Sequence, residues 1–188
     1  MSWIVVLAKV VGSSVPFASS AVQFASELGS RDIQARLRRL EDPISALHPD
    51  VRELAEIVYR SVEDTDESRV QLTDEQYDSF RRPLAILEAH GHIRGSHSLQ
   101  QKFIAGFWLT DPTFVLYMCA LYEDADIMER LVAFLETTKP STWIRGKDLA
   151  QEYAVPLPVI KALFQMYEAR GLGVLSTELG VVNFYLRD

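Results

Sequence analysis

Residues 142–186, TWIRGKDLAQEYAVPLPVIKALFQMYEARGLGVLSTELGVVNFYL, carry the most information about the fold of this chain. The hydrophobic pattern and the turn residues predict a short strand, a helix, a tight turn, a longer helix that ends at Gly171, and a two-strand ribbon. The turn is expected at residues 154–156. Pro158 suits the first turn of the longer helix, because the N–H that proline lacks needs no partner there. Residues 176–180 are expected to form the tip of the ribbon.

The apolar residues of this stretch recur at spacings that turn one side of each element inward. The residues expected to face the core are Leu149, Ala150 and Tyr153 in the first helix and Ile160, Leu163, Phe164 and Tyr167 in the second. Leu172, Val174, Val181, Phe184 and Leu186 suit the strands of the ribbon. The positions left for the exposed side of the longer helix are Leu157, Pro158, Lys161, Gln165 and Glu168.

This order of elements resembles the winged helix-turn-helix superfamily found in many bacterial regulators. The resemblance covers residues 142–186 and rests on a Leu-Ala pair, a Val-Pro turn, a Leu-Phe pair and the sequence Glu-x-x-Gly-Leu. It implies a binding role rather than catalysis, and it does not name the ligand. In such regulators the second helix enters the major groove of DNA. Here only Lys161 is basic among the expected exposed positions, Gln165 is the other base-reading type, and the ribbon tip carries Glu178. Docking of a protein, or a structural role, is therefore favoured for this module.

A weak internal repeat predicts a second copy of the module earlier in the chain. Residues 168–171 (EARG) align with residues 88–91 (EAHG), and Ile160, Phe164 and Tyr167 then fall on Phe80, Leu84 and Leu87. Each long helix would have an inward apolar side, a glycine at its C-terminus and an extended segment after it. No short helix is obvious before the long helix of the first copy.

Local signals fill in residues 48–138. Thr73 and Gln76 form a capping box that opens a helix, and Pro83 is expected to kink or restart it. Around the Asp111-Pro112 turn the sequence favours two strands, or a strand followed by a helix. Another helix is expected from about 126 to 138. The predicted fold is mainly α with small β-ribbons: an N-terminal helical arm (1–47), a first winged-helix-like module (48–122) and a C-terminal winged-helix module (123–188).

The N-terminal arm is predicted to contain two amphipathic helical segments. Its apolar stripe gives two alternatives: packing on the rest of the chain, or self-association and partner binding through a short seam resembling a coiled coil. The candidate partner-binding residues are Phe17, Phe24, Leu28, Ile33, Leu37 and Leu40. Lys9, Gly12 and Pro16 interrupt the first apolar run, so neither a signal peptide nor a membrane span is expected. The arm also loosely resembles helical leader segments of some bacterial defence and signalling proteins.

The net charge of −7, from 19 basic and 26 acidic residues, argues mildly against a dedicated DNA-binding protein. Between residues 81 and 102, however, the cations outnumber the single acid Glu88, and three histidines are interleaved with them. The candidate nucleic-acid contacts are Arg81, Arg82, Arg94 and Lys102, with Lys161 and Gln165 from the C-terminal module. An ordinary solvated loop is the alternative interpretation. A nearby aromatic set is expected to be core rather than a base-stacking platform: Phe103, Phe107, Trp108, Phe114 and Tyr117.

Motifs for catalysis, phosphate binding and cofactors are missing from the sequence. His90, His92 and His97 are expected to be surface-loop histidines rather than zinc ligands, because no cysteine or tightly spaced carboxylate accompanies them. The single cysteine, Cys119, lies in an apolar run and is expected to be a buried thiol. We expect neither an enzyme nor a cofactor.

The sequence therefore favours a non-catalytic, cytoplasmic adaptor that acts through protein–protein contacts, oligomeric or bound to a larger partner, in bacterial regulation or defence. The first alternative is a DNA-binding transcriptional regulator that uses the basic region 81–102. The second is a membrane-associating effector that uses the N-terminal helix.

Overall fold

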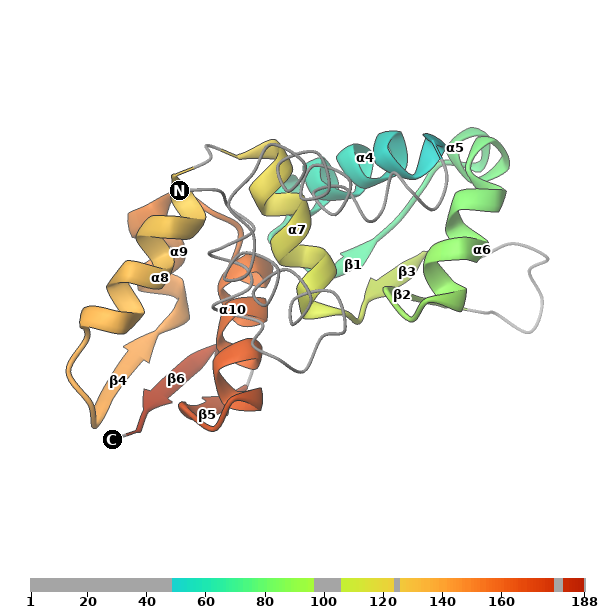
Figure 1. Ribbon diagram of the computed structural model, residues 1–188. Coiled ribbons are helices and arrows are strands. Elements are labelled where there is room, and N and C mark those ends of the chain that lie inside the picture. Colours follow the sequence, from blue (N-terminus) through green and yellow to red (C-terminus); the bar gives the residue numbers. More distant parts are fainter. Residues whose placement is uncertain (1–48, 97–105, 124–125, 178–180, 188) are drawn as a thin grey trace, which may run out of the picture.

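The computed structural model describes residues 49–96, 106–123, 126–177 and 181–187, and it is mainly helical with two small antiparallel sheets (Figure 1). The candidate residues of the N-terminal arm and Lys102 lie outside these ranges. The described elements up to residue 122 are α4 (Pro49–Thr65), β1 (Arg69–Val70), α5 (Asp74–Ser79), α6 (Arg81–Ala89), β2 (Ile93–Gly95), β3 (Phe107–Leu109) and α7 (Pro112–Tyr122).

After α7, the chain repeats the order found from α4 to β3: a helix, a strand, two helices and two strands. Its elements are α8 (Ile127–Thr137), β4 (Thr142–Arg145), α9 (Gly146–Tyr153), α10 (Leu157–Ala169), β5 (Gly173–Ser176) and β6 (Asn183–Leu186). Between residues 142 and 186 the strand, two helices and two strands follow the predicted order. Residues 178–180, most of the expected ribbon tip, lie outside the described residues.

The two sheets have the same topology. The first sheet has the order β1-β3-β2 and the second the order β4-β6-β5, so in each the last strand lies in the middle. Their registers correspond as well: Val70 pairs with Phe107 in the first sheet, and Ile144 pairs with Phe184 in the second. All four side chains are buried. The two halves therefore share one plan for their interior.

The alignment of residues 88–91 with 168–171 is confirmed by hydrogen bonds. The Glu88 carboxylate accepts from the N–H of Gly95 at 3.1 Å, and the Glu168 carboxylate accepts from the N–H of Leu175 at 2.9 Å. Both helices end in a glycine with positive φ, 76° at Gly91 and 74° at Gly171, a conformation that glycine adopts without a steric penalty. Each glutamate therefore ties the end of its helix to the strand that follows.

Most of the local signals were read correctly. The Thr73 capping box is present, and the helix is interrupted at Phe80, three residues before Pro83. Asp111 caps a helix that begins at Pro112, so the strand-then-helix alternative is the correct one. The expectation that the first copy lacks a short helix was wrong. α5, the helix that the Thr73 capping box opens, fills this place; it buries no residue and so has no apolar stripe to mark it as part of the repeat.

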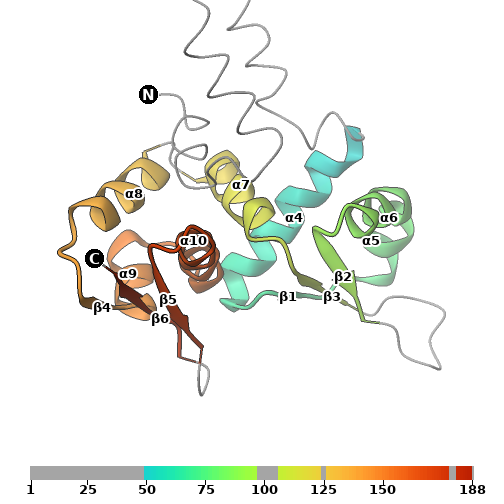
Figure 2. The ribbon, with the colours of Figure 1, turned by 60° about the horizontal axis from the view of Figure 1, so that its bottom comes forward.

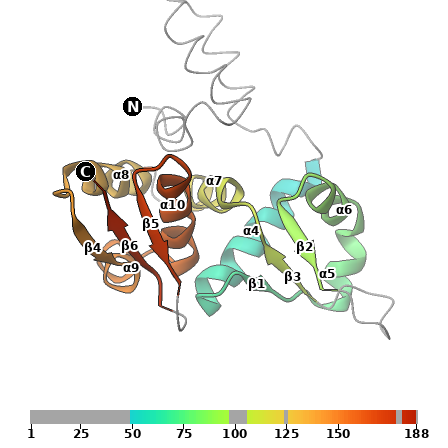
Figure 3. The same ribbon diagram turned by 90° about the horizontal axis from the view of Figure 1, so that it is seen from below.

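A helical layer joins the two halves. α7 lies between α4 and α10 in all three views, and Figure 3 shows the two sheets on opposite sides of α7 and α10 (Figure 2, Figure 3). The α7 residues from Phe114 to Cys119 are all buried, as expected for a helix covered on both sides. α10 likewise buries eight residues: Pro158, Val159, Ile160, Ala162, Leu163, Phe164, Met166 and Tyr167.

None of the helices within the described ranges combines the length and the apolar character needed to cross a membrane.

Candidate binding faces

The outer face of the second sheet carries a row of apolar side chains. Residues alternate along a strand, so the neighbours of buried Ile144 and Phe184 point away from the core. Trp143 pairs with Tyr185, and Tyr185 pairs with Val174, so these three residues form one row across all three strands. We call this row the second-sheet face.

The second-sheet face leaves large apolar side chains exposed to water. The Trp143 side chain is 60% exposed and its ring centroid lies 5.3 Å from that of Tyr185. Val174 is exposed as well, and so are Arg145 on β4 and Arg187 just after β6. An apolar centre with a charged rim is the usual composition of a protein interface. Tryptophan, tyrosine and arginine are also the residue types that contribute most to binding at such interfaces.

The outer face of the first sheet has a different composition. Trp108 on the middle strand pairs with Arg69 on one side and with Arg94 on the other. Both arginines are exposed, and the Arg69 guanidinium carbon lies 5.7 Å from the Trp108 ring centroid, within the range of a cation–π contact. We call Arg69, Trp108 and Arg94 the first-sheet face.

Trp108 was wrongly expected to be core. Its side chain is 42% exposed, whereas Phe107, Phe114 and Tyr117 are buried as predicted. The apolar neighbours of Trp108 in sequence suggested burial, but the alternation of a strand turns Phe107 inward and Trp108 outward. Phe103 lies outside the described residues.

Of the four cations predicted between residues 81 and 102, the three that the structure describes are not gathered on one surface. Arg94 lies on the first-sheet face, whereas Arg81 and Arg82 begin α6, which packs its Leu84 and Leu87 into the core on the inner side of the sheet. Arg81 also forms an ion pair with Asp78 at 2.7 Å. Arg82 is exposed.

The exposed side of α10 is narrower than expected. Pro158 is buried rather than exposed, and Leu157, Lys161 and Gln165 are half-buried, leaving Glu168 as the exposed member of the predicted set. The sequence predicted one apolar stripe, at Ile160, Phe164 and Tyr167. A second stripe at Val159, Ala162 and Met166 is also buried, because α7 packs along this helix.

The N-terminus of α10 is occupied by a carboxylate from the first half of the chain. The Leu157 N–H donates to the carboxylate of Asp66, which follows α4 in a left-handed turn with φ 55°. A negative group at this end of a helix is favourable, because the N–H groups there lack partners within the helix. Beside this contact lies a groove of about 490 Å³, lined by Glu63, Asp66, Lys147, Gln151, Val155 and Leu157 among others. The Asp66 carboxylate therefore occupies a helix N-terminus, a place where an anion such as phosphate would otherwise bind, and Glu63 lines the groove beside it.

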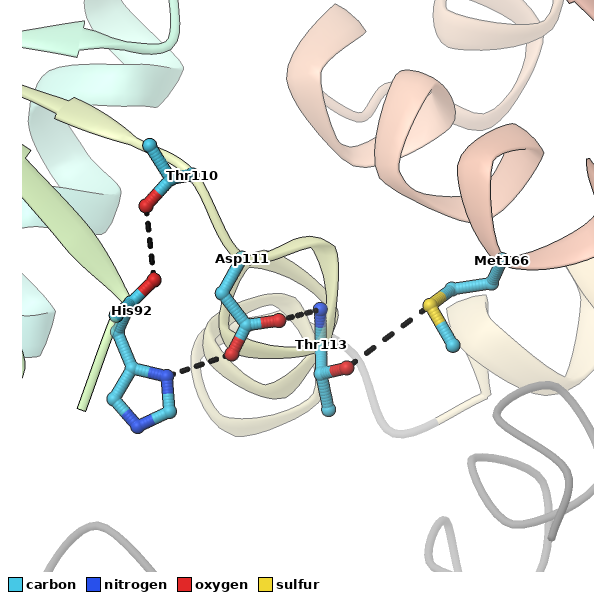
Figure 4. Close-up of polar contacts among 6 residues, drawn as sticks. His92, Thr110, Asp111, Thr113 and Met166 are labelled. Carbon is cyan, nitrogen blue, oxygen red and sulfur yellow. Dashed lines mark hydrogen bonds and ion pairs between the residues drawn. The ribbon is translucent and has the colours of Figure 1, made fainter. Parts of the chain in front are cut away.

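A short chain of polar contacts links the first sheet to α7 and α10 (Figure 4). His92 Nδ1 lies 2.6 Å from one oxygen of Asp111, whose other oxygen accepts from the N–H of Thr113 at 2.8 Å. The Thr113 hydroxyl in turn points at the sulfur of Met166 on α10, 4.0 Å away. Burial by itself raises the pKa of Asp111, but the hydrogen bonds from His92 and Thr113 outweigh it, so the pKa is lowered overall.

The sequence suggested that His92 is a surface-loop residue, and this expectation was wrong. Its side chain is half-buried, bonded to Asp111 and packed on the Phe114 ring at 5.3 Å between centroids. Its neighbour His90 is exposed, and His97 lies outside the described residues. Within the described ranges, no group of three or more His, Cys, Asp or Glu side chains is arranged to hold a metal ion.

The buried thiol predicted at Cys119 is confirmed. Cys119 is fully buried, and burial raises its pKa to about 12. Tyr59, packed in the same core, donates its hydroxyl to the Glu123 carboxylate at 2.9 Å. Burial, and then the proximity of Cys119 and Glu123, also raise the pKa of Tyr59. A thiol that stays protonated at neutral pH is a poor nucleophile, so this cluster serves packing.

Comparison with known proteins adds no family to this description: no protein-family model, no curated protein and no solved structure matches the chain significantly.

Proposed function

We propose that the chain is a non-catalytic adaptor built of two tandem winged helix-turn-helix modules, and that it binds a protein partner through the second-sheet face. The partner surface is apolar at its centre and acidic at its rim, complementary to Trp143, Tyr185 and Val174 flanked by Arg145 and Arg187.

The module assignment is supported by the order of elements and by the sheets. Each half has a helix, a strand, two helices and two strands, and in each sheet the third strand lies between the other two. The shared glutamate bond and glycine helix end give the two halves one local design as well.

The observation that carries the proposed function is the 60% exposure of Trp143 within an apolar row that crosses the whole sheet. A large aromatic side chain in water gains free energy when it is covered, at roughly 25 cal/mol per Å² of apolar surface removed from water. Single exposed apolar residues are common on proteins, but a contiguous row marks an interaction site.

Protein binding is favoured over DNA binding for the C-terminal module because of how α10 is held. α7 covers one side of this helix, and Asp66 occupies its N-terminus. Affinity for DNA depends on several cations that neutralise phosphates, and the outer side of α10 offers only Lys161 for this purpose.

Photo-crosslinking in the native cell tests the proposal. A benzophenone amino acid replaces Trp143 in one variant and the exposed Glu152 of α9 in a control variant. We expect one discrete protein adduct at position 143 and none at position 152. The same adducts at both positions, or none at either, would contradict the proposal. An adduct between two copies of the chain at position 143 would indicate that the second-sheet face serves self-association, and it would contradict the adaptor role.

A further inference from the structure

The first-sheet face combines an exposed aromatic ring with a cation on each side of it. Arg69 and Arg94 lie on the strands that flank Trp108, each about 4.8 Å from the middle strand. The face is polar beyond this row: Gln71 on the same side of β1 is exposed, and Ser96 follows β2. Among the described residues of this sheet, both partners of Trp108 are arginines, in contrast to the apolar row of the second-sheet face.

This composition suits a ligand that is flat, aromatic and negatively charged at intervals. A nucleic-acid base stacks on an aromatic side chain, and such stacking tolerates any base because every base has a π face. Arginine contacts phosphate oxygens through two parallel N–H groups. A base on Trp108 would place its own phosphate and that of its neighbour on opposite sides of the ring, where Arg69 and Arg94 stand.

The arrangement favours a single strand over a duplex. The bases of a duplex are stacked on one another and present only their edges, whereas an unpaired base can be splayed out onto a sheet. The Arg69 guanidinium carbon lies over the Trp108 ring in the free chain, 5.7 Å from its centroid, so a base that stacks on the covered ring face displaces Arg69 toward the phosphate. Glu67 is exposed two residues before Arg69 and is the nearest acid in sequence to this arginine.

We propose that the first-sheet face binds single-stranded nucleic acid, with a base stacked on Trp108 and the adjacent phosphates contacted by Arg69 and Arg94. This binding goes beyond the proposed adaptor function and uses a different surface, so either can fail without the other.

Fluorescence anisotropy of a short fluorescein-labelled oligothymidylate, titrated with the full chain, tests the proposal. Trp108→Leu removes the stacking surface and is expected to weaken binding at least about fivefold, and Trp108→Phe is expected to restore most of it. Arg69→Ala and Arg94→Ala are each expected to weaken binding. Each is also expected to make the slope of the logarithm of the binding constant against the logarithm of the salt concentration shallower by about 0.7. Glu67→Gln is expected to leave binding unchanged or to strengthen it.

Matched controls come from the second sheet. Trp143→Leu and Arg145→Ala remove an exposed tryptophan and an exposed arginine from the other outer face, and binding is expected to change less than about twofold. Thermal unfolding of each variant checks that the fold is kept.

Four results would overturn the proposal. The first is the absence of binding to the oligothymidylate at low salt. The second is equal binding by the wild type and Trp108→Leu. The third is tighter binding to a fluorescein-labelled DNA duplex of the same length than to the oligothymidylate, lost with Arg81→Ala and Arg82→Ala, which would assign nucleic-acid binding to α6 instead. Displacement of the oligothymidylate by polyglutamate at equal charge concentration would also count against it, since the face would then recognise acidic protein.

Discussion

The outer faces of the two sheets occupy equivalent places in two halves with the same internal plan, and the rows of side chains across their strands differ in chemistry. The middle strand of the first sheet carries Trp108 between two arginines, whereas the middle strand of the second carries Tyr185 between Trp143 and Val174. The inward residues one position away, Phe107 and Phe184, are the same type and equally buried.

This difference separates what the fold requires from what binding requires. Inward residues must fill a closed space, so both halves keep an aromatic ring at the same position of the core. Outward residues of a small sheet meet only water unless something binds there, so their composition is unconstrained by packing. The cationic row in one half and the apolar row in the other are the basis on which we propose two ligands of different chemistry.

The equivalence of the two cores can be tested with a matched pair of large-to-small substitutions. Phe184→Ala removes a ring stacked on Phe164 at 4.9 Å, and Phe107→Ala removes its counterpart in the first sheet. Each is expected to lower the free energy of unfolding by about 3–5 kcal/mol, measured by urea denaturation. If one of the two costs less than about 1 kcal/mol, the halves do not share the same core design.

A second test uses pH, because Tyr167 in the second half falls where the first half has Leu87. Burial raises the pKa of Tyr167 from 10.0 to about 12. As the pH rises, the unfolded chain therefore loses this proton before the folded chain does. The free energy of unfolding keeps the full contribution of the neutral hydroxyl below pH 10 and loses it as the pH rises towards 12.

Tyr167→Phe is accordingly expected to reduce the alkaline loss of stability by up to about 2–3 kcal/mol. Denaturant titrations at neutral and alkaline pH measure the difference. The remaining alkaline loss is assigned to Tyr59 and Cys119 in the first half, whose pKa values are raised by burial as well. An unchanged alkaline slope in Tyr167→Phe would show that this hydroxyl ionises as readily in the folded chain as in the unfolded one.

The smallest expected effect concerns the glutamates that fasten each long helix to the next strand. Glu88→Ala and Glu168→Ala each remove an acceptor of a backbone N–H and are expected to cost about 1 kcal/mol. The glutamine variants keep an acceptor oxygen and are expected to recover part of this cost. Glu152→Ala on the exposed side of α9 serves as the control. Unequal losses at 88 and 168 would show that the shared bond contributes differently to the two halves.

The sequence was most informative where the chain makes local structure. The capping box at Thr73, the glycine helix ends at Gly91 and Gly171, and the Asp111-Pro112 helix start all depend on residues close together in sequence, and all are present. The correspondence of Glu88 and Glu168 was visible as a short sequence repeat. Its physical reason is the hydrogen bond that each glutamate accepts from the following strand.

The candidate binding faces were not predictable in the same way. They depend on strand register, which brings Arg69 and Arg94 beside Trp108 although these residues are up to 39 positions apart. Likewise, burial of Val159, Ala162 and Met166 depends on the docking of α7, which no pattern within α10 encodes. No sequence signal marked Trp108 as outward-facing, because residues 107–109 are all apolar and show no alternation of apolar and polar types.

The most direct test of whether the two sheet faces serve different ligands is affinity purification from native cells. The full chain is purified in parallel with two variants, Trp143→Glu and Trp108→Leu. We predict that Trp143→Glu loses a stoichiometric protein partner and keeps salt-sensitive nucleic acid, and that Trp108→Leu does the reverse. Retention of the same protein partner at the same stoichiometry by Trp143→Glu would contradict the assignment of the second-sheet face to partner binding.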